Sequence, residues 1–131
     1  MNAKGTFEVQ MNAVEQTEHG DGAMRGRWSL DKQFSGDLVG TGLGEVLTVG
    51  TKSGSAAYVA IEEIKGVLLG RAGSFFFQHS ATMHQDQQSL TITVVPDSGT
   101  AALSGISGSF LITIVDGIHF YEFEYSIGDE V

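Results

Sequence analysis

Cysteine, proline, basic residues and long apolar runs are all scarce or absent in this sequence of 131 residues. The absence of cysteine excludes disulfide bonds and thiol chemistry. Seven Lys and Arg against sixteen Asp and Glu give a net charge of −9, which argues against nucleic acid and anionic membranes as partners. No run approaches the ~18 apolar residues of a membrane span, and the N-terminal residues lack a signal-peptide pattern. We therefore expect a cytoplasmic protein of bacterial type.

The residues that are present predict a folded chain made of strands. Hydrophobic residues make up 41% of the sequence, and 18 glycines indicate many tight turns. Apolar residues alternate with a period of two, and turn residues recur about every 8–16 positions, which is typical of all-β proteins. The expected strands are 3–11, 24–34, 38–49, 55–68, 72–82, 89–95, 110–115 and 118–127.

These strands are joined mostly by short turns, so each is expected to pair with its neighbour in the sequence. Asp116-Gly117 is the strongest two-residue hairpin signal, and Pro96 stops the sixth strand because it has no amide hydrogen. An open sheet would leave two unpaired edges, which closure removes. We predict a single domain over residues 1–131 that forms an eight-stranded antiparallel meander barrel with little or no helix. A barrel of this size is filled by side chains or holds one small ligand.

Glu62 is the first candidate functional residue. Because successive strand residues point to opposite faces, Glu62 shares its face with Tyr58, Ala60 and Ile64. Parity alone does not say which face lies inside the barrel. A carboxylate inside needs hydrogen-bond partners and is a candidate for catalysis, whereas the alternative is a solvated glutamate near a strand end.

The last strand supplies a second group of candidates. His119, Tyr121 and Tyr125 fall on one face of residues 118–127, together with Phe123. Such residues combine an apolar body with a polar tip and can line a pocket, although core aromatics with locally satisfied polar atoms give the same pattern. The candidate ligand-binding set is Tyr58, Glu62, Gln78, His79, His119, Tyr121 and Tyr125.

Motifs for cofactors and metals are weak. The glycines of residues 40–44 resemble a phosphate-binding loop, but the chain continues as a strand and opens no helix, which argues against nucleotide binding. His79 with His84, and the acidic residues of 15–21 with His19, lack the spacing of zinc ligands. We expect no metal and no cofactor.

The Gly26-Arg27-Trp28 segment resembles the Gly-x-Trp signature of the lipocalins, which are also eight-stranded barrels. In lipocalins the signature lies on the first strand, whereas here the strand 3–11 precedes it. A lipocalin is therefore the alternative identification of this chain.

Blocks in order along nearly the whole chain resemble a bacterial domain-of-unknown-function family with an allene-oxide-cyclase-like, or calycin-like, barrel. The matching blocks are residues 5–9, 34–40, the segment around Ile61-Glu62, 73–79, 94–100, 103–108, and His119-x-Tyr121 with Tyr125. The Gly-Thr element and Leu103-Ser104-Gly105-Ile106-Ser107-Gly108 also resemble a loop of allene oxide cyclases and dirigent proteins. The resemblance implies a homo-oligomer, either a dimer or a trimer.

Three functions remain open on this basis. The first is binding of a small, mostly apolar ligand inside the barrel. The second is a cyclase or isomerase that uses Glu62, with Tyr121 or His119, to steer a proton or charge. The third is a structural oligomer whose interior is filled by side chains, so whether the protein is an enzyme stays open at this point.

Overall fold

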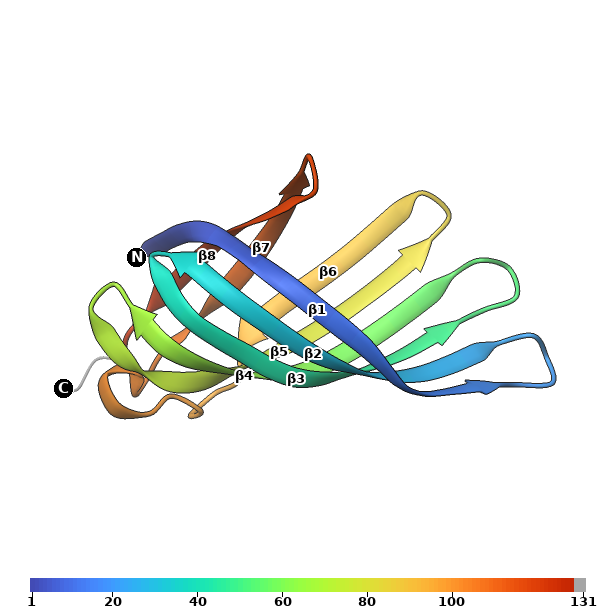
Figure 1. The fold of residues 1–131 in the computed structure, drawn as a ribbon, viewed down its shortest axis with the longest axis horizontal. Helices are drawn as coiled ribbons and strands as arrows, with labels where there is room; N and C mark the ends of the chain where they lie inside the picture. The colour runs from blue at the N-terminus through green and yellow to red at the C-terminus, as the bar shows by residue number, and fades with distance from the viewer. Residues whose placement is uncertain (129–131) are drawn as a thin grey trace.

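A computed structural model describes residues 1–128, and eight strands form a closed barrel in sequential order, β1 to β8 (Figure 1). All neighbouring strands pair antiparallel. The prediction of an all-β, eight-stranded meander barrel is confirmed. The strands are β1 (Asn2–Glu18), β2 (Met24–Gly36), β3 (Leu38–Gly50), β4 (Ala56–Leu68), β5 (Arg71–His84), β6 (Gln87–Val94), β7 (Ser107–Val115) and β8 (Ile118–Ser126).

The largest departure from the predicted boundaries is in β1, which continues to Glu18 through a segment expected to be a loop. It does so because β2 pairs with it over this whole length, and a register shift between Ala13 and Glu15 lets the strand bend. The connection after β6 contains a short 3₁₀ turn, Ala101–Leu103, which buries Leu103. Among the described residues, no helix is long and apolar enough to cross a membrane.

Alternation along the strands decides which side chains enter the barrel. On β4, Ala60, Glu62, Ile64 and Leu68 are buried, whereas Val59 is half exposed on the outer face. The antiparallel register places Glu62 opposite Gly44 of β3. The face that sequence parity left undecided is therefore the inner face.

One end of the barrel is filled by aromatic rings. Phe123 lies with its ring centroid 5.4 Å from that of Phe77 and 5.8 Å from those of Phe75 and Phe110. We call this region the packed end, and its other buried members are Phe34, Leu38, Leu68, Leu103, Ile106, Tyr121 and Tyr125. The N-terminus and the β2–β3 and β4–β5 turns lie toward this end, at the left of Figure 1.

The opposite end is less tightly closed, and we call it the open end. Pairing between β1 and β8 stops at Phe7 and His119, and β6 pairs with β7 only through Thr93 and Ser109. The four hairpins that join β1–β2, β3–β4, β5–β6 and β7–β8 therefore separate toward the right and top of Figure 1.

Glycines on the inner face of β3 allow the close approach of β4. A Cβ atom added at Gly44 would collide with the backbone of Ile61, and one added at Gly40 would collide with the backbone of Lys65. At Gly42 the obstacle is instead the carboxylate of Glu62. Gly40, Gly42 and Gly44 thus allow two strands to lie close together, and Gly42 also leaves space for a buried charge.

Candidate functional site

Three polar side chains meet inside the barrel, midway along its strands. Glu62 Oε1 lies 2.8 Å from His79 Nε2 and 3.3 Å from Lys32 Nζ. All three residues are buried, with exposed fractions of 0% for Glu62, 4% for Lys32 and 5% for His79. We call this group the charge cluster. Buried charges are stable only when they are paired and hydrogen-bonded, which the cluster provides.

The strand register explains how residues from β2, β4 and β5 come together. Lys32 pairs with Gly42 on β3, the strand that separates β2 from β4. Because Gly42 has no side chain, the lysine reaches across β3 to Glu62, whose second oxygen lies where a Cβ atom of residue 42 would be. His79 follows two residues after Phe77, the partner of Glu62 on β5, and therefore points to the same inner face.

The environment of Lys32 disfavours its positive charge. Burial lowers the pKa of Lys32 below its ordinary value of 10.5, and the attraction and hydrogen bond of Glu62 offset this only in part. The ammonium also lies 4.8 Å from the ring centroid of Phe7 and 5.9 Å from that of Phe34. These contacts hold the side-chain end in one place.

The two oxygens of the Glu62 carboxylate have different numbers of hydrogen-bond partners. Oε1 faces both Lys32 and His79, whereas the buried Oε2 has no hydrogen-bond partner among the described residues. Since Oε1 is an acceptor when the carboxylate is ionised, the short contact requires His79 to donate from Nε2. The carboxylate therefore places a hydrogen atom on Nε2 of the imidazole.

A cavity of about 270 Å³ lies beside the charge cluster and extends toward the open end. This volume is close to the lower end of the ~300–1,000 Å³ that is usual for small-molecule sites. Lys32 and His79 are part of its wall, and Glu62 lies behind them. The rest of the wall is Phe7, Val9, Met11, Leu30, Val46, Thr48, Tyr58, Ala60, Gln88, Leu90, Ile112, Ile114 and His119.

Three of the predicted site residues, Tyr58, His79 and His119, line this cavity together. Burial raises the pKa of Tyr58, so its phenol is present in the neutral form over a wider pH range. The ring centroid of His119 is 5.1 Å from that of Phe7, which also lies against the ammonium of Lys32. The histidine and the lysine thus both lie close to one aromatic ring.

The other predicted residues lie elsewhere. Tyr121 is in the packed end, where its hydroxyl donates to Ser35 O and accepts from the Leu38 amide, both at 2.9 Å. Tyr125 is buried in the same end, against Phe123. Gln78 projects from the outer face of β5 and is exposed. Tyr121 and Tyr125 therefore act as core residues in this structure.

Lys32 is the site residue that sequence reasoning missed. The signal was present, because Lys32 continues the alternation of Trp28 and Leu30 and is followed by Phe34 at the same parity. Lysine is rarely buried, so the pattern is easily taken for the exposed end of a strand. Its burial depends on Glu62, which is 30 positions further along the chain.

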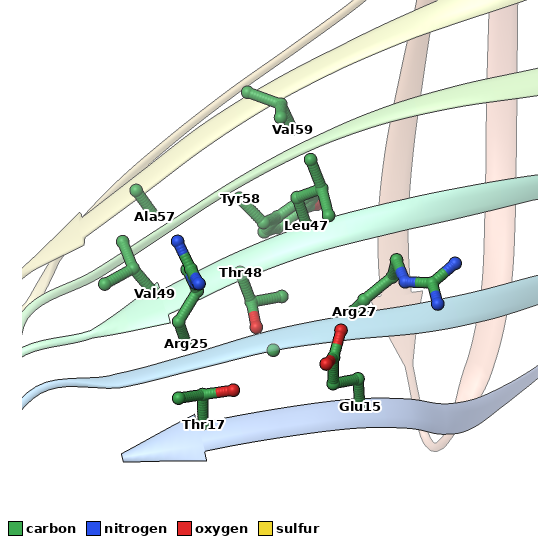
Figure 2. Close-up of a pocket in the computed structure, with 11 residues that line it drawn as sticks. Glu15, Thr17, Arg25, Arg27, Leu47, Thr48, Val49, Ala57, Tyr58 and Val59 are labelled. Carbon is green, nitrogen blue, oxygen red and sulfur yellow. The ribbon is translucent and has the colours of Figure 1, made fainter. Parts of the chain in front are cut away.

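A second hollow, of about 370 Å³, lies near the β1–β2 hairpin, and its lining residues are shown in Figure 2. Arg25 and Gly26 are adjacent on β2 and both line it, so residues of both faces contribute where the strand ends twist. Arg27 lies beside this hollow and forms an exposed ion pair with Glu45 at 3.1 Å. Exposed pairs of this kind contribute little to stability.

The residues weighed as metal ligands do not gather at one place. Within residues 1–128, no three His, Cys, Asp or Glu side chains form a group that could hold a metal ion. His84 Nδ1 instead lies 2.9 Å from the hydroxyl of Ser55.

Fold and site together define a small closed β-barrel with a buried charge cluster beside a ligand-sized cavity. Residues 3–125 match the family described as "Protein of unknown function (DUF3224)", and the chain belongs to this family. It is similar to the crystal structure of a DUF3224 protein of unknown function from Shewanella oneidensis MR-1. The two share 39% sequence identity over 98% of each chain, with a TM-score of 0.92. No curated protein matches the chain.

The resemblance to a bacterial family of unknown function is thereby confirmed. The further similarity to allene oxide cyclases and dirigent proteins stays a prediction, and the lipocalin alternative gains no support from these matches.

Proposed function

We propose that the protein binds one small, mostly apolar molecule in the cavity at the open end of the barrel. The observation that carries this proposal is the composition of the cavity wall. Apolar side chains form most of it, and a few polar ends, those of Lys32, Tyr58, His79 and His119, face the same space. Apolar walls that supply affinity, with few polar groups that fix orientation, are typical of small-molecule sites.

The alternative of a barrel filled by its own side chains describes only the packed end. There the rings of Phe75, Phe77, Phe110 and Phe123 leave no comparable space, and each ring is at most 2% exposed. Toward the open end, Ile112 is only partly buried, and Ile114 remains 61% exposed. Apolar side chains left around a cavity in this way are those that a ligand would cover.

The alternative of a cyclase that uses Glu62 takes a different form in this structure. Because Glu62 lies behind Lys32 and His79, its carboxylate can influence a bound molecule only through these two residues. Tyr121 takes no part, since its hydroxyl is hydrogen-bonded at the packed end. The likeness to allene oxide cyclases would support this alternative, but it has no residue correspondence in this chain.

The experiment compares binding of 3-phenylpropanol, a small neutral probe, to two matched variants by ligand-observed NMR. Ala60→Trp places an indole in the cavity from the inner face, whereas Ser80→Trp adds the same ring on the exposed outer face of the barrel. We expect the unaltered protein and Ser80→Trp to bind the probe and Ala60→Trp to lose binding. Equal binding to both variants would contradict the proposal.

Native mass spectrometry of the purified protein gives a second readout. A mass per subunit above the denatured mass would show a co-purified small molecule and identify its class, and the excess should be absent from Ala60→Trp. The same spectrum counts subunits and so tests the expected dimer or trimer.

A further inference from the structure

We propose that Lys32 is a nucleophile that condenses with a small apolar aldehyde or ketone in the cavity and forms an imine through its Nζ atom. This inference rests on the proposed function, because it names the chemical class of the molecule that the cavity takes. It assigns Lys32 a covalent role and gives Glu62 and His79 the proton transfers.

The position of Lys32 sets it apart from the other lysines of the chain. Lys4, Lys52 and Lys65 are exposed, whereas Lys32 is buried and lines the cavity. Its Nζ atom is held by Glu62 and the Phe7 and Phe34 rings, and Glu62 is its one hydrogen-bond partner among residues 1–128. An amine fixed at the wall of an apolar cavity is already placed against a carbonyl carbon that enters there.

The amine of Lys32 is also more easily available in its neutral, nucleophilic form. Burial lowers its pKa, and the opposing effect of Glu62 is the smaller one. A lysine desolvated in an apolar pocket is one of the recognised ways of activating this side chain for addition to a carbonyl group. Exposed lysines lack this activation and stay protonated near neutral pH.

The reaction balances with groups that the cluster already holds. The nitrogen lone pair attacks the carbonyl carbon, the C–N bond forms, and the carbonyl π electrons move to oxygen. The nitrogen passes one proton to Glu62 Oε1, which is 3.3 Å away, and the oxygen takes one proton from His79, which gives a carbinolamine. After Glu62 has returned its proton to His79, His79 protonates the hydroxyl group, water leaves as the C=N bond replaces the C–O bond, and the second N–H proton passes to Glu62. The net products are an imine and one water molecule.

Protons move over short distances within the charge cluster. Glu62 Oε1 lies 2.8 Å from His79 Nε2, so once His79 has given up its Nε2 proton, Glu62 can return to that nitrogen the proton that it accepted from the lysine. Glu62 is then a positioning and relay residue that does not touch the carbonyl compound, while Lys32 is the catalytic residue.

A neutral carbonyl group fits the cluster better than a carboxylate does. Lys32 already faces one carboxylate, and a second one in the same apolar space would share a single ammonium with Glu62. Two anions in a space of low dielectric constant repel each other strongly. An aldehyde or ketone brings an electrophilic carbon without added charge.

The test is reductive trapping with 3-phenylpropanal and sodium borohydride at neutral pH, followed by peptide mapping. A trapped imine adds the mass of the aldehyde less one oxygen atom. We expect Lys32 to be labelled severalfold more than the exposed Lys4, Lys52 and Lys65 at limiting aldehyde, because the cavity holds the aldehyde against its Nζ atom and burial lowers its pKa. Labelling spread over exposed amines, with Lys32 unmodified, would overturn the inference.

Variants separate this inference from the proposed function. Ala60→Trp keeps Lys32 but fills the cavity, so labelling of Lys32 should be lost, while Ser80→Trp should be labelled like the unaltered protein. Lys32→Arg keeps a cation without the nucleophile and should trap no aldehyde, whereas Lys65→Arg, at an exposed position, should be labelled at Lys32 like the unaltered protein. Glu62→Gln should slow the appearance of trapped product and alter its pH profile.

Binding of 3-phenylpropanol, the alcohol that matches the aldehyde, distinguishes failure of the imine inference from failure of the proposed binding function. Binding of 3-phenylpropanol without trapping of 3-phenylpropanal at Lys32 would overturn the imine inference and leave the binding function intact. Absence of binding by the alcohol and of trapping by the aldehyde would overturn both. Tight binding of 3-phenylpropanoate without trapping would show that Lys32 serves as an ion-pair partner, and this too would overturn the inference.

Discussion

The two ends of this barrel use the same alternation of side chains for different purposes. At the packed end, inward residues from β5, β7 and β8 are aromatic and fill the space, and the Tyr121 hydroxyl ties β8 to the β2–β3 turn. Toward the open end, the inward residues of the same strands are smaller or polar, and a cavity of about 270 Å³ remains. The charge cluster lies between the two regions.

The difference shows how a small fold can provide stability and a site at once. The packed end belongs to the larger of the two clusters of buried apolar residues, and this burial favours folding. It helps to offset the cost of burying Lys32, Glu62 and His79, whose burial opposes folding unless the pairing is good. The three residues whose burial opposes folding are also the ones whose side chains can take part in a reaction.

The largest expected effect is the difference in stability loss between a substitution at the packed end and one at the open end. Phe123→Ala should lower the free energy of unfolding by about 3–5 kcal/mol, because a fully buried ring is replaced by a cavity among four other rings. Ile114→Ala, at a side chain that is 61% exposed, should cost only about 0.5 kcal/mol. Urea unfolding curves measure both, and equal costs would remove the distinction between a packed end and an open end.

A second comparison uses two glycines on the inner face of β3. Gly42→Ala places a methyl group against the carboxylate of Glu62 and should lower the free energy of unfolding by about 1–3 kcal/mol. Gly50→Ala, near the open end, meets no atom within 4 Å and should change it by no more than about 0.5 kcal/mol. Thermal or urea unfolding checks this, and a neutral Gly42→Ala variant would show that the carboxylate does not occupy that space.

The third comparison uses the pH dependence of stability. The folded state lowers the pKa of Lys32 below its ordinary 10.5, so between these values the unfolded chain binds more protons. Stability therefore rises with pH in this window, by up to about 1.4 kcal/mol per pH unit. Lys32→Met lacks this rise, so its deficit relative to the unaltered protein should grow as the pH increases toward 10.5.

Unfolding in urea between about pH 7 and pH 10 measures this difference, because the window lies below the ordinary lysine value. Glu62 and His79, the groups that face Lys32, remain in both proteins, and so do Tyr58, Tyr121 and Tyr125, whose pKa values burial raises. Lys65→Met, at an exposed position, is the control and should follow the unaltered protein. Parallel curves for Lys32→Met and the unaltered protein would contradict the assigned direction.

Much of the fold could be predicted because its signals are local. Period-two alternation, turn glycines and the Asp116-Gly117 hairpin depend on neighbouring residues, and they located all eight strands. Strand β1 was underestimated because residues 12–18 show no alternation of apolar and polar side chains and are held in place by pairing with β2. Pairing with another strand cannot be detected from the alternation of residues within β1 itself.

The site was predictable only in part, for the same reason. Parity placed Glu62 with the apolar residues of β4 and indicated that His79 shares a face with Phe75 and Phe77. Parity could not show that His119 lines the cavity whereas Tyr121 lies in the packed end. Both residues share one face of β8, and they differ only in their position along the barrel axis. Gln78 was included in the candidate ligand-binding set although it has the opposite parity to Phe77 and His79. Its parity already indicated the outer face, where the structure places it.

The sequence by itself determined that the chain is all-β, that its strands meander, and that one face of each strand is apolar, because these properties follow from local spacing and turn chemistry. Only the tertiary structure decided that Lys32 reaches over Gly42 to a carboxylate on the second strand away, and that a cavity remains beside them. Burial of a charge depends on a partner distant in sequence, and residual space depends on how far all eight strands converge.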